Sequence, residues 1–120
     1  MEIYTYQVAR WRAVKKQDII AFDTTVKSGI PFLAPWWDIV LGYKNGRVSE
    51  VEYTQQYLTE LYRRFENDPA LWDEILQHPR IALGCYCPSG KFCHRHLLAQ
   101  FIAGHLTILN EPFELKGEVF

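Results

Sequence analysis

The sequence predicts a small α/β domain in which helices pack on a mostly parallel sheet. Residues 18–26 and 80–87 are short, continuously apolar segments, which are typical of buried strands. Segments with helical periodicity and recognisable ends lie between and after them. Because strands joined by helical crossovers run parallel, this alternation predicts a layered fold. A length of 120 residues with 48% apolar content fits a single domain, residues 1–120.

The first half of the chain begins with two predicted strands. EIYTYQVA, residues 2–9, alternates apolar and polar side chains, and DIIAFDTTV, residues 18–26, is the more buried strand. KSGIPFLAPWW, residues 27–37, is expected to be a loop because one glycine and two prolines interrupt it. One of its two adjacent tryptophans is expected in the core. WDIVLGYKNG, residues 37–46, can form two helical turns that end at its Asn-Gly pair.

The next two helices have clear start signals. Ser49 and Glu52 form a capping-box pattern at the start of the amphipathic segment 49–68. Asp68 as N-cap and Pro69 at the first helical position begin another helix.

The last third of the chain returns to strands. Residues 80–87 form the third predicted strand, and residues 93–103 form an amphipathic helix that we expect Gly104 to end. FELKGEVF, residues 113–120, is a candidate edge strand. The complete order predicts a Rossmann-like layered fold, in which ligands bind beyond the carboxyl ends of strands.

Composition excludes several classes of function. Thirteen Lys and Arg against fourteen Asp and Glu leave no broad basic field, so duplex nucleic acid is not an expected partner. No uncharged apolar stretch reaches about 18 residues and no signal-peptide pattern is present, so we expect a cytoplasmic protein that does not bind membranes. Three cysteines without a secretion signal favour reduced thiols over a disulfide framework. Homo-oligomerisation is left open.

The turn after the third predicted strand is the first candidate site. Gly90 lets the backbone approach a ligand, and the free N–H groups of the following helix start favour an anion such as phosphate. Lys91 and Arg95 would supply positive charge, and Cys87 and His94 adjoin them. An ordinary tight turn with surface bases is equally compatible with this pattern.

Cys93 is the candidate catalytic residue. A thiol at a helix N-terminus beside arginine and histidine is favoured in its reactive thiolate form, although adjacent helical positions such as 93 and 94 rarely bring their side chains together. The alternative is zinc bound by Cys85, Cys87, Cys93 and His94. No metal is the primary expectation, because the usual pair of cysteines separated by two residues is missing.

The end of the second predicted strand is the other candidate site. Asp23 can accept hydrogen bonds from ribose hydroxyls, while Thr25, Lys27 and Ser28 offer donors to phosphate oxygens. Alternatively, Asp23 only caps the turn, which is a common use of aspartate. Trp37 is expected to stack on a base or another planar ring.

Three segments carry a resemblance to a known family: FDTTVKSGIPFLAPWWDIV, SEVEYTQQYLTELY and LGCYCPSGKFCHRHLLAQF. Over about residues 19–106 the chain resembles domain-of-unknown-function family 488, in the compact form often carried by bacteriophages. The resemblance implies a small α/β domain and no particular reaction. Trp36 departs from it, because a polar residue is expected there. The implied motif positions are Asp23, Thr25, Lys27, Ser28, Gly29, Pro35, Tyr53, Cys85, Cys87, Gly90, Cys93, His94 and Arg95.

These observations together predict a pocket at two strand ends that binds a phosphate-bearing, nucleotide-like molecule without a cofactor. The phage association implied by the resemblance suggests a nucleotide of phage DNA metabolism or of host immune signalling. The protein would sequester or process it in the host cytoplasm and so evade host defence. The alternatives are a cysteine-dependent enzyme acting on a nucleotide or nucleoside, and a zinc-binding interaction module.

Overall fold

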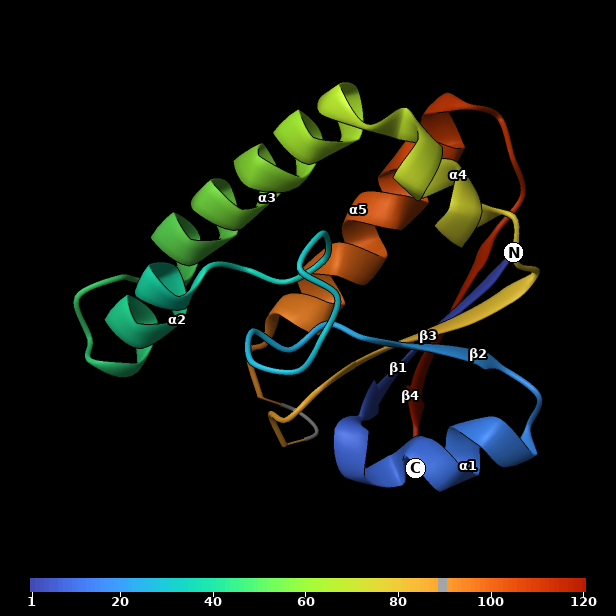
Figure 1. Ribbon diagram of the computed structural model, residues 1–120, viewed down its shortest axis with the longest axis horizontal. Coiled ribbons are helices and arrows are strands. Elements are labelled where there is room, and N and C mark those ends of the chain that lie inside the picture. The colour runs from blue at the N-terminus through green and yellow to red at the C-terminus, as the bar shows by residue number, and fades with distance from the viewer. Residues whose placement is uncertain (89–90) are drawn as a thin grey trace.

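A four-stranded parallel sheet forms the centre of the computed structural model, which describes residues 1–88 and 91–120 (Figure 1). Every neighbouring pair of these strands is parallel, in the order β2-β3-β1-β4. The predicted α/β layered fold is therefore confirmed, and the C-terminal segment is an edge strand as expected. The strands are β1 (Glu2–Gln7), β2 (Ile20–Asp23), β3 (Arg80–Cys85) and β4 (Glu114–Val119).

Helices cover both faces of this sheet. Figure 1 shows α3, α4 and α5 on one face and α1 on the other. The larger core joins the first face to the three helices, and a smaller cluster, which includes Val14 of α1 and Ala82 of β3, fills the opposite side. The helices within the described residues are a 3-10 turn (Val8–Arg10), α1 (Trp11–Lys16), α2 (Trp37–Lys44), α3 (Glu50–Asn67), α4 (Pro69–Leu76) and α5 (His94–Ile108).

Several element ends differ from the prediction. Strand β2 stops at Asp23 and β3 at Cys85. After β2 the chain enters a turn in which the Asp23 carboxylate accepts a hydrogen bond from the Thr25 N–H. Helix α5 does not end at Gly104 but continues to Ile108. Glycine costs a helix about 1 kcal/mol relative to alanine. Burial of Leu106 in the following turn favours continuation of the helix.

The start of α3 follows the predicted capping box. Ser49 Oγ accepts a hydrogen bond from the Glu52 N–H at 3.1 Å, and the Glu52 carboxylate accepts one from the Ser49 N–H at 3.3 Å. At α4, Pro69 occupies the first turn as predicted, but the Asp68 side chain makes no capping hydrogen bond. The capping residues in the sequence thus correctly predicted where α3 and α4 begin. The predicted side-chain capping hydrogen bonds are present only at α3.

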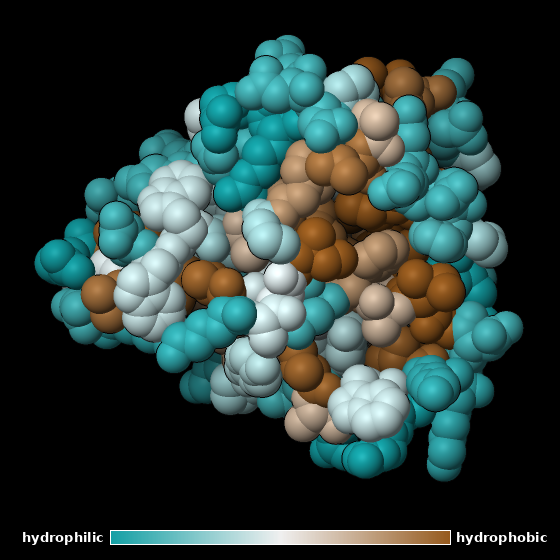
Figure 2. Space-filling view, in the orientation of Figure 1, coloured by the Kyte–Doolittle hydropathy of each residue, from teal (hydrophilic) through white to brown (hydrophobic). Residues whose placement is uncertain are grey.

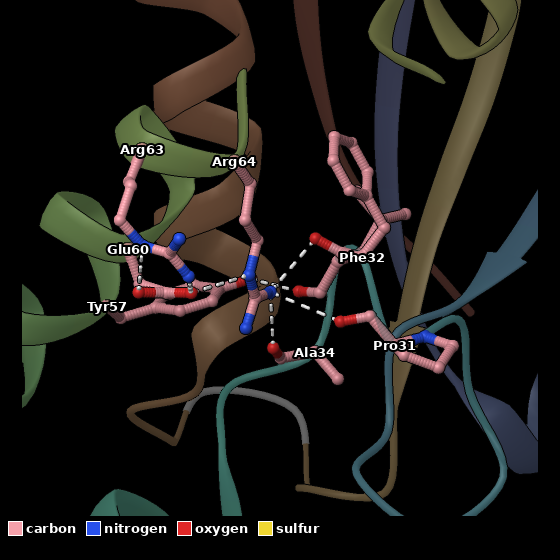
Figure 3. A network of polar contacts seen from close by, with 8 residues as sticks. Pro31, Phe32, Ala34, Tyr57, Glu60, Arg63 and Arg64 are labelled. Atoms are coloured by element: carbon pink, nitrogen blue, oxygen red, sulfur yellow. Dashed lines mark hydrogen bonds and ion pairs between the residues drawn. The ribbon is translucent and has the colours of Figure 1, made fainter. Parts of the chain in front are cut away.

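Helix α3 also holds the loop that follows β2 (Figure 3). Tyr57 donates its hydroxyl hydrogen to the Leu33 carbonyl at 2.6 Å, and Glu60 accepts a hydrogen bond from Arg64 Nε at 3.2 Å. The Arg64 Nη1 donates to three loop carbonyls, those of Pro31 at 3.2 Å, Phe32 at 2.9 Å and Ala34 at 2.7 Å. The loop is therefore fixed although it has no regular secondary structure.

Figure 2 shows apolar residues gathered in a hollow over β2 and beside α4. This hollow has a volume of about 330 Å³, and its apolar lining consists of Phe22, Ile30, Phe32, Leu71 and Ile75.

In the part of the chain that the structure describes, none of the helices combines the length and apolar character needed to cross a membrane.

Candidate functional site

A larger pocket, of about 520 Å³, lies beyond the carboxyl ends of β2 and β3. The loop after β2, helix α2, the N-terminal part of α3 and the segment between β3 and α5 form its walls. Adjacent parallel strands end at the same edge of a sheet, so two segments far apart in the sequence meet here. Aromatic side chains dominate the lining, namely Trp37, Tyr43, Tyr53, Tyr86 and Phe92.

His94 lies buried at the floor of this pocket. Its Nε2 is 2.8 Å from the Thr24 carbonyl oxygen and 2.9 Å from the Thr24 hydroxyl, which itself donates to the Gly84 carbonyl at 2.8 Å. A carbonyl can only accept, so Nε2 carries the hydrogen and Nδ1 keeps its lone pair. Burial lowers the pKa of His94 to about 4, despite the hydrogen bond to Thr24, so the ring is neutral at pH 7.

Cys93 lies next to the Nδ1 lone pair. Its Sγ is 3.7 Å from His94 Nδ1, so the expectation that these neighbouring side chains diverge is wrong. The reason is local: Cys93 is the N-cap, with φ −157° and ψ 148°, and only His94 is helical. Its extended backbone turns the thiol toward the imidazole, which creates a buried sulfur and nitrogen pair at the pocket.

Cys85 completes a cluster of three side chains at the same place. The sulfur atoms of Cys85 and Cys93 are in contact as a disulfide pair, whereas Cys87 is free, so the expectation of three reduced thiols does not hold for two of them. Within the described residues, the ligand atoms of Cys85, Cys93 and His94 lie within 4.8 Å of one another. The alternative metal set predicted from the sequence therefore loses Cys87, which lines the pocket but lies outside this group.

Arg95 does not face the pocket. It is completely buried, and its guanidinium pairs with the Glu118 carboxylate of β4. Its Nη1 also donates to the Cys87 carbonyl and to the Cys85 sulfur, both at 2.8 Å. The predicted anion-binding role of Arg95 is thus replaced by an internal one, because its hydrogen bonds attach the start of α5 to the end of β3.

The rest of the predicted anion-binding turn lies away from the pocket wall or outside the described structure. Lys91 is exposed and is not among the described residues that line the pocket, and Gly90 is outside the described residues. The segment between β3 and α5 therefore supplies Cys87 and Phe92 to the pocket in place of the two predicted bases, Lys91 and Arg95.

Asp23 fixes the turn after β2, which is the alternative role considered for it. Its two carboxylate oxygens accept hydrogen bonds from the Thr25 N–H at 2.9 Å and from the Ser28 hydroxyl at 3.1 Å. Ser28 Oγ also lies 3.1 Å from the Tyr86 hydroxyl. A Cβ at Gly29 would lie 2.6 Å from the Asp23 carbonyl oxygen and closer still to Thr25, so this turn requires glycine. Of these residues, Thr25 and Tyr86 reach the pocket.

Two lysines of the pocket lining lie over the ring of the same tryptophan. The Lys27 and Lys44 ammonium groups are 5.6 Å and 5.9 Å from the centre of the Trp37 ring. Trp36 and Trp37 are 36% and 42% exposed, so the prediction that one of them lies in the core is wrong. The aromatic and cationic side chains of α2 and the preceding loop are therefore available to a ligand.

Comparison with known protein families shows to which family the chain belongs. Residues 3–106 match the family model described as "Active DUF488-N3 subclade". The chain belongs to the DUF488 family. This agrees with the resemblance read from the sequence. No curated protein and no solved structure matches the chain.

The DUF488 match includes the whole pocket but excludes β4. Glu118, the partner of buried Arg95, therefore lies outside the matched residues.

Sequence reasoning missed Tyr43 and Lys44 as pocket residues. The spacing of positions 37, 40 and 44 is i, i+3, i+7 on α2, which was the available signal that Lys44 shares a helix face with Trp37.

Proposed function

We propose that this DUF488 protein binds a phosphate-bearing, nucleotide-like small molecule in the 520 Å³ pocket. The observation that carries the proposal is the placement of two lysine ammonium groups over Trp37, in a pocket whose other walls are largely aromatic. Aromatic faces favour a planar base, and adjacent ammonium groups favour phosphate oxygens.

The size and lining of the pocket support this ligand class. Pockets for small molecules usually have volumes of about 300–1,000 Å³ and apolar walls with a few polar groups. Here the polar groups include the Thr25 and Tyr86 side chains, which can donate to or accept from sugar hydroxyls. The aromatic ring of Tyr53 also packs edge-on against those of Tyr43 and Phe92, which are tilted against each other, and these contacts keep this wall in place.

Charge supports a local binding site. Because the formal net charge is −1, attraction of an anion depends on nearby cations rather than on the whole molecule. Lys27 and Lys44 are the cations that line the pocket among the described residues. Lys27 keeps the phosphate-binding role that the sequence predicted for it, and we assign to Lys44, beside the same tryptophan, the role that the sequence predicted for Arg95 and Lys91.

The biological role that we propose is to sequester or process a nucleotide of phage DNA metabolism or of host immune signalling. The ligand class supports both possibilities. The word "active" in the description of the matched subclade supports processing.

The test is a binding screen of the reduced protein against mononucleotides, ADP-ribose derivatives and cyclic dinucleotides. We expect at least one compound to raise the unfolding temperature, because a ligand that binds only the folded state stabilises it. Titration calorimetry with that compound should then show that Lys27→Ala and Lys44→Ala each bind it with an affinity at least about tenfold lower than that of the wild type. This is the loss expected when a charge-assisted hydrogen bond is removed. Trp37→Ala should lose about 1–3 kcal/mol of binding free energy if the base stacks there.

Lys16→Ala on α1 is the matched control, since this exposed lysine lies on the opposite face of the sheet. It should bind with wild-type affinity. If none of the compounds binds, the proposal fails. If Lys91→Ala alone abolishes binding, the phosphate site lies at the turn before α5 and the assignment to Lys27 and Lys44 is wrong.

A further inference from the structure

A metal centre can be built from residues at the floor of the same pocket. Cys85 ends β3, Cys93 caps α5 and His94 begins that helix, so rigid elements hold all three side chains. They are 1%, 4% and 7% exposed, and their ligand atoms lie within 4.8 Å of one another. Two thiolates and one imidazole are ligand types that zinc prefers over magnesium or calcium.

The orientation of His94 fits a metal ligand. Its Nε2–H donates to the Thr24 carbonyl oxygen at 2.8 Å, and Nδ1 is on the side of Cys93. A histidine that binds a metal through one nitrogen usually donates the other N–H to a carbonyl or carboxylate, which fixes the ring. Thr24 already makes this contact.

The backbone spacing fits two sulfurs bound to one ion. The Cα atoms of Cys85 and Cys93 are 7.8 Å apart, whereas disulfides usually have Cα separations of about 4.4–6.8 Å. Two thiolates on one tetrahedral zinc ion, each at about 2.3 Å from the metal, have their sulfurs about 3.8 Å apart. Rotation of the two side chains away from each other can supply that separation without bringing β3 and α5 closer.

The charges around the cluster favour deprotonated sulfur. Arg95 Nη1 donates to Cys85 Sγ at 2.8 Å, and the N-terminal end of α5 lies at Cys93. A guanidinium and a helix N-terminus both stabilise a thiolate, which is the form that binds metal. Two thiolates also balance the charge of one divalent cation, so the buried centre would be neutral.

We propose that, once a thiol reductant has reduced the Cys85–Cys93 disulfide to two thiolates and has itself been oxidised, Cys85, Cys93 and His94 Nδ1 bind one Zn²⁺ ion, whose fourth coordination position opens into the pocket. All three residues line that pocket, so the fourth position faces the ligand space. Zinc with three protein ligands and one open position is the arrangement of catalytic sites, whereas structural sites use four protein ligands. The role of the open position toward a nucleotide rests on the proposed function; binding of the ion itself does not.

The experiment measures metal content in protein purified under reducing conditions from cells supplied with zinc. We expect about one equivalent of zinc per chain in the wild type, because two thiolates and one imidazole already held within 4.8 Å of one another bind zinc tightly. Cys85→Ser, Cys93→Ser and His94→Gln should each retain less than about a tenth of an equivalent. Cys87→Ser is the matched control: this free cysteine lines the same pocket outside the cluster and should keep the full equivalent.

A second measurement keeps the test valid if a variant does not fold. Chelator-treated wild-type protein should bind Co²⁺ with thiolate-to-metal charge-transfer absorption, and added Zn²⁺ should remove that absorption. Wild-type protein that stays metal-free after addition of zinc overturns the proposal, as does equal zinc loss in Cys87→Ser. The Lys27→Ala variant should keep its zinc, so failure of nucleotide binding and failure of metal binding are separate results.

Discussion

At the scale of single residues, Thr24 joins the sheet to the candidate site. Its hydroxyl donates to the Gly84 carbonyl and lies 2.9 Å from His94 Nε2, while its own carbonyl accepts from the same ring. One small residue thus determines which nitrogen of His94 faces Cys93. Its replacement by valine would remove the hydroxyl contacts to Gly84 and His94 but leave the backbone hydrogen bond from the Thr24 N–H to the Gly84 carbonyl at 2.9 Å.

Gly84 gives a prediction at this scale. A Cβ at this position would lie 2.8 Å from the Tyr6 hydroxyl oxygen and closer to its ring carbons, because the tyrosine side chain crosses β3 there. Gly84→Ala should therefore lower the free energy of unfolding by about 1–3 kcal/mol, as other overpacked cores do. Urea denaturation followed by fluorescence measures the change.

Gly104→Ala is the opposite control. A Cβ at Gly104 meets no atom within 4 Å, and the residue lies inside α5. Alanine should raise stability there by up to about 1 kcal/mol. Equal effects of the two substitutions would show that the Tyr6 contact does not matter.

The residue scale is also where prediction from sequence was weakest. Asp23 and Arg95 have side chains that suit ligands, but the structure uses them for a turn and for a buried ion pair. Composition and local spacing do not reveal which side chain is consumed inside the protein. Arg95 in particular depends on Glu118, which is 23 positions away and could not be paired with it from the sequence.

At the scale of elements, local signals were more informative. The capping box correctly placed the start of α3, because Ser49 and Glu52 satisfy each other's backbone N–H groups within one turn. Pockets and loops depend on contacts between elements, and the sequence did not show that α3 holds the loop after β2 through Arg64 (Figure 3).

Substitution of Arg64 therefore tests how the loop is held, and substitution of the neighbouring Arg63 serves as the control. Arg64→Ala removes the donor to three loop carbonyls and should lower the free energy of unfolding by about 1.5–3 kcal/mol, as expected for hydrogen bonds to a charged group. Amide hydrogen exchange in residues 29–36 should also become faster, because the loop loses its attachment to α3.

Arg63→Ala tests whether this effect is specific. Arg63 bonds to the same Glu60 carboxylate, but its side chain is 62% exposed. Exposed ion pairs contribute about 0.2–1 kcal/mol, so this variant should be nearly as stable as wild type and exchange at the wild-type rate. Loop exchange accelerated equally in both variants would contradict the role of Arg64.

At the scale of the whole molecule, the alternation of strands and helices was sufficient to predict a parallel layered sheet and the edge at which the pocket lies. Strand order was not predictable, because β1 lies between β3 and β4 through contacts that span most of the chain. The consequence is that the last strand, at one edge of the sheet, pairs with the first strand of the chain. Glu118 of β4 accepts hydrogen bonds from Thr5 of β1 and from Arg95 of α5.

This link predicts a specific dependence of stability on pH. Burial raises the pKa of Glu118, but hydrogen bonds from Arg95 and Thr5 lower it more, so it lies below its ordinary value of 4.5. A depressed carboxyl pKa stabilises the folded state above the unfolded-state pKa, and this contribution disappears as the pH falls through the folded-state pKa. At pH 7, Glu118→Gln leaves the Arg95 charge buried and unpaired and should cost about 3 kcal/mol.

The difference in unfolding free energy between wild type and Glu118→Gln should therefore shrink as the pH falls below 4.5, because protonated Glu118 also leaves Arg95 unpaired. Denaturation curves between pH 7 and pH 3 measure it. Glu114→Gln on the same strand is the control, since its carboxylate is 68% exposed and pairs only with Lys116 among the described residues. It should change stability by less than about 1 kcal/mol. An offset for Glu118→Gln that stays constant down to pH 3 would show that the carboxylate charge does not hold β4 to the rest of the molecule.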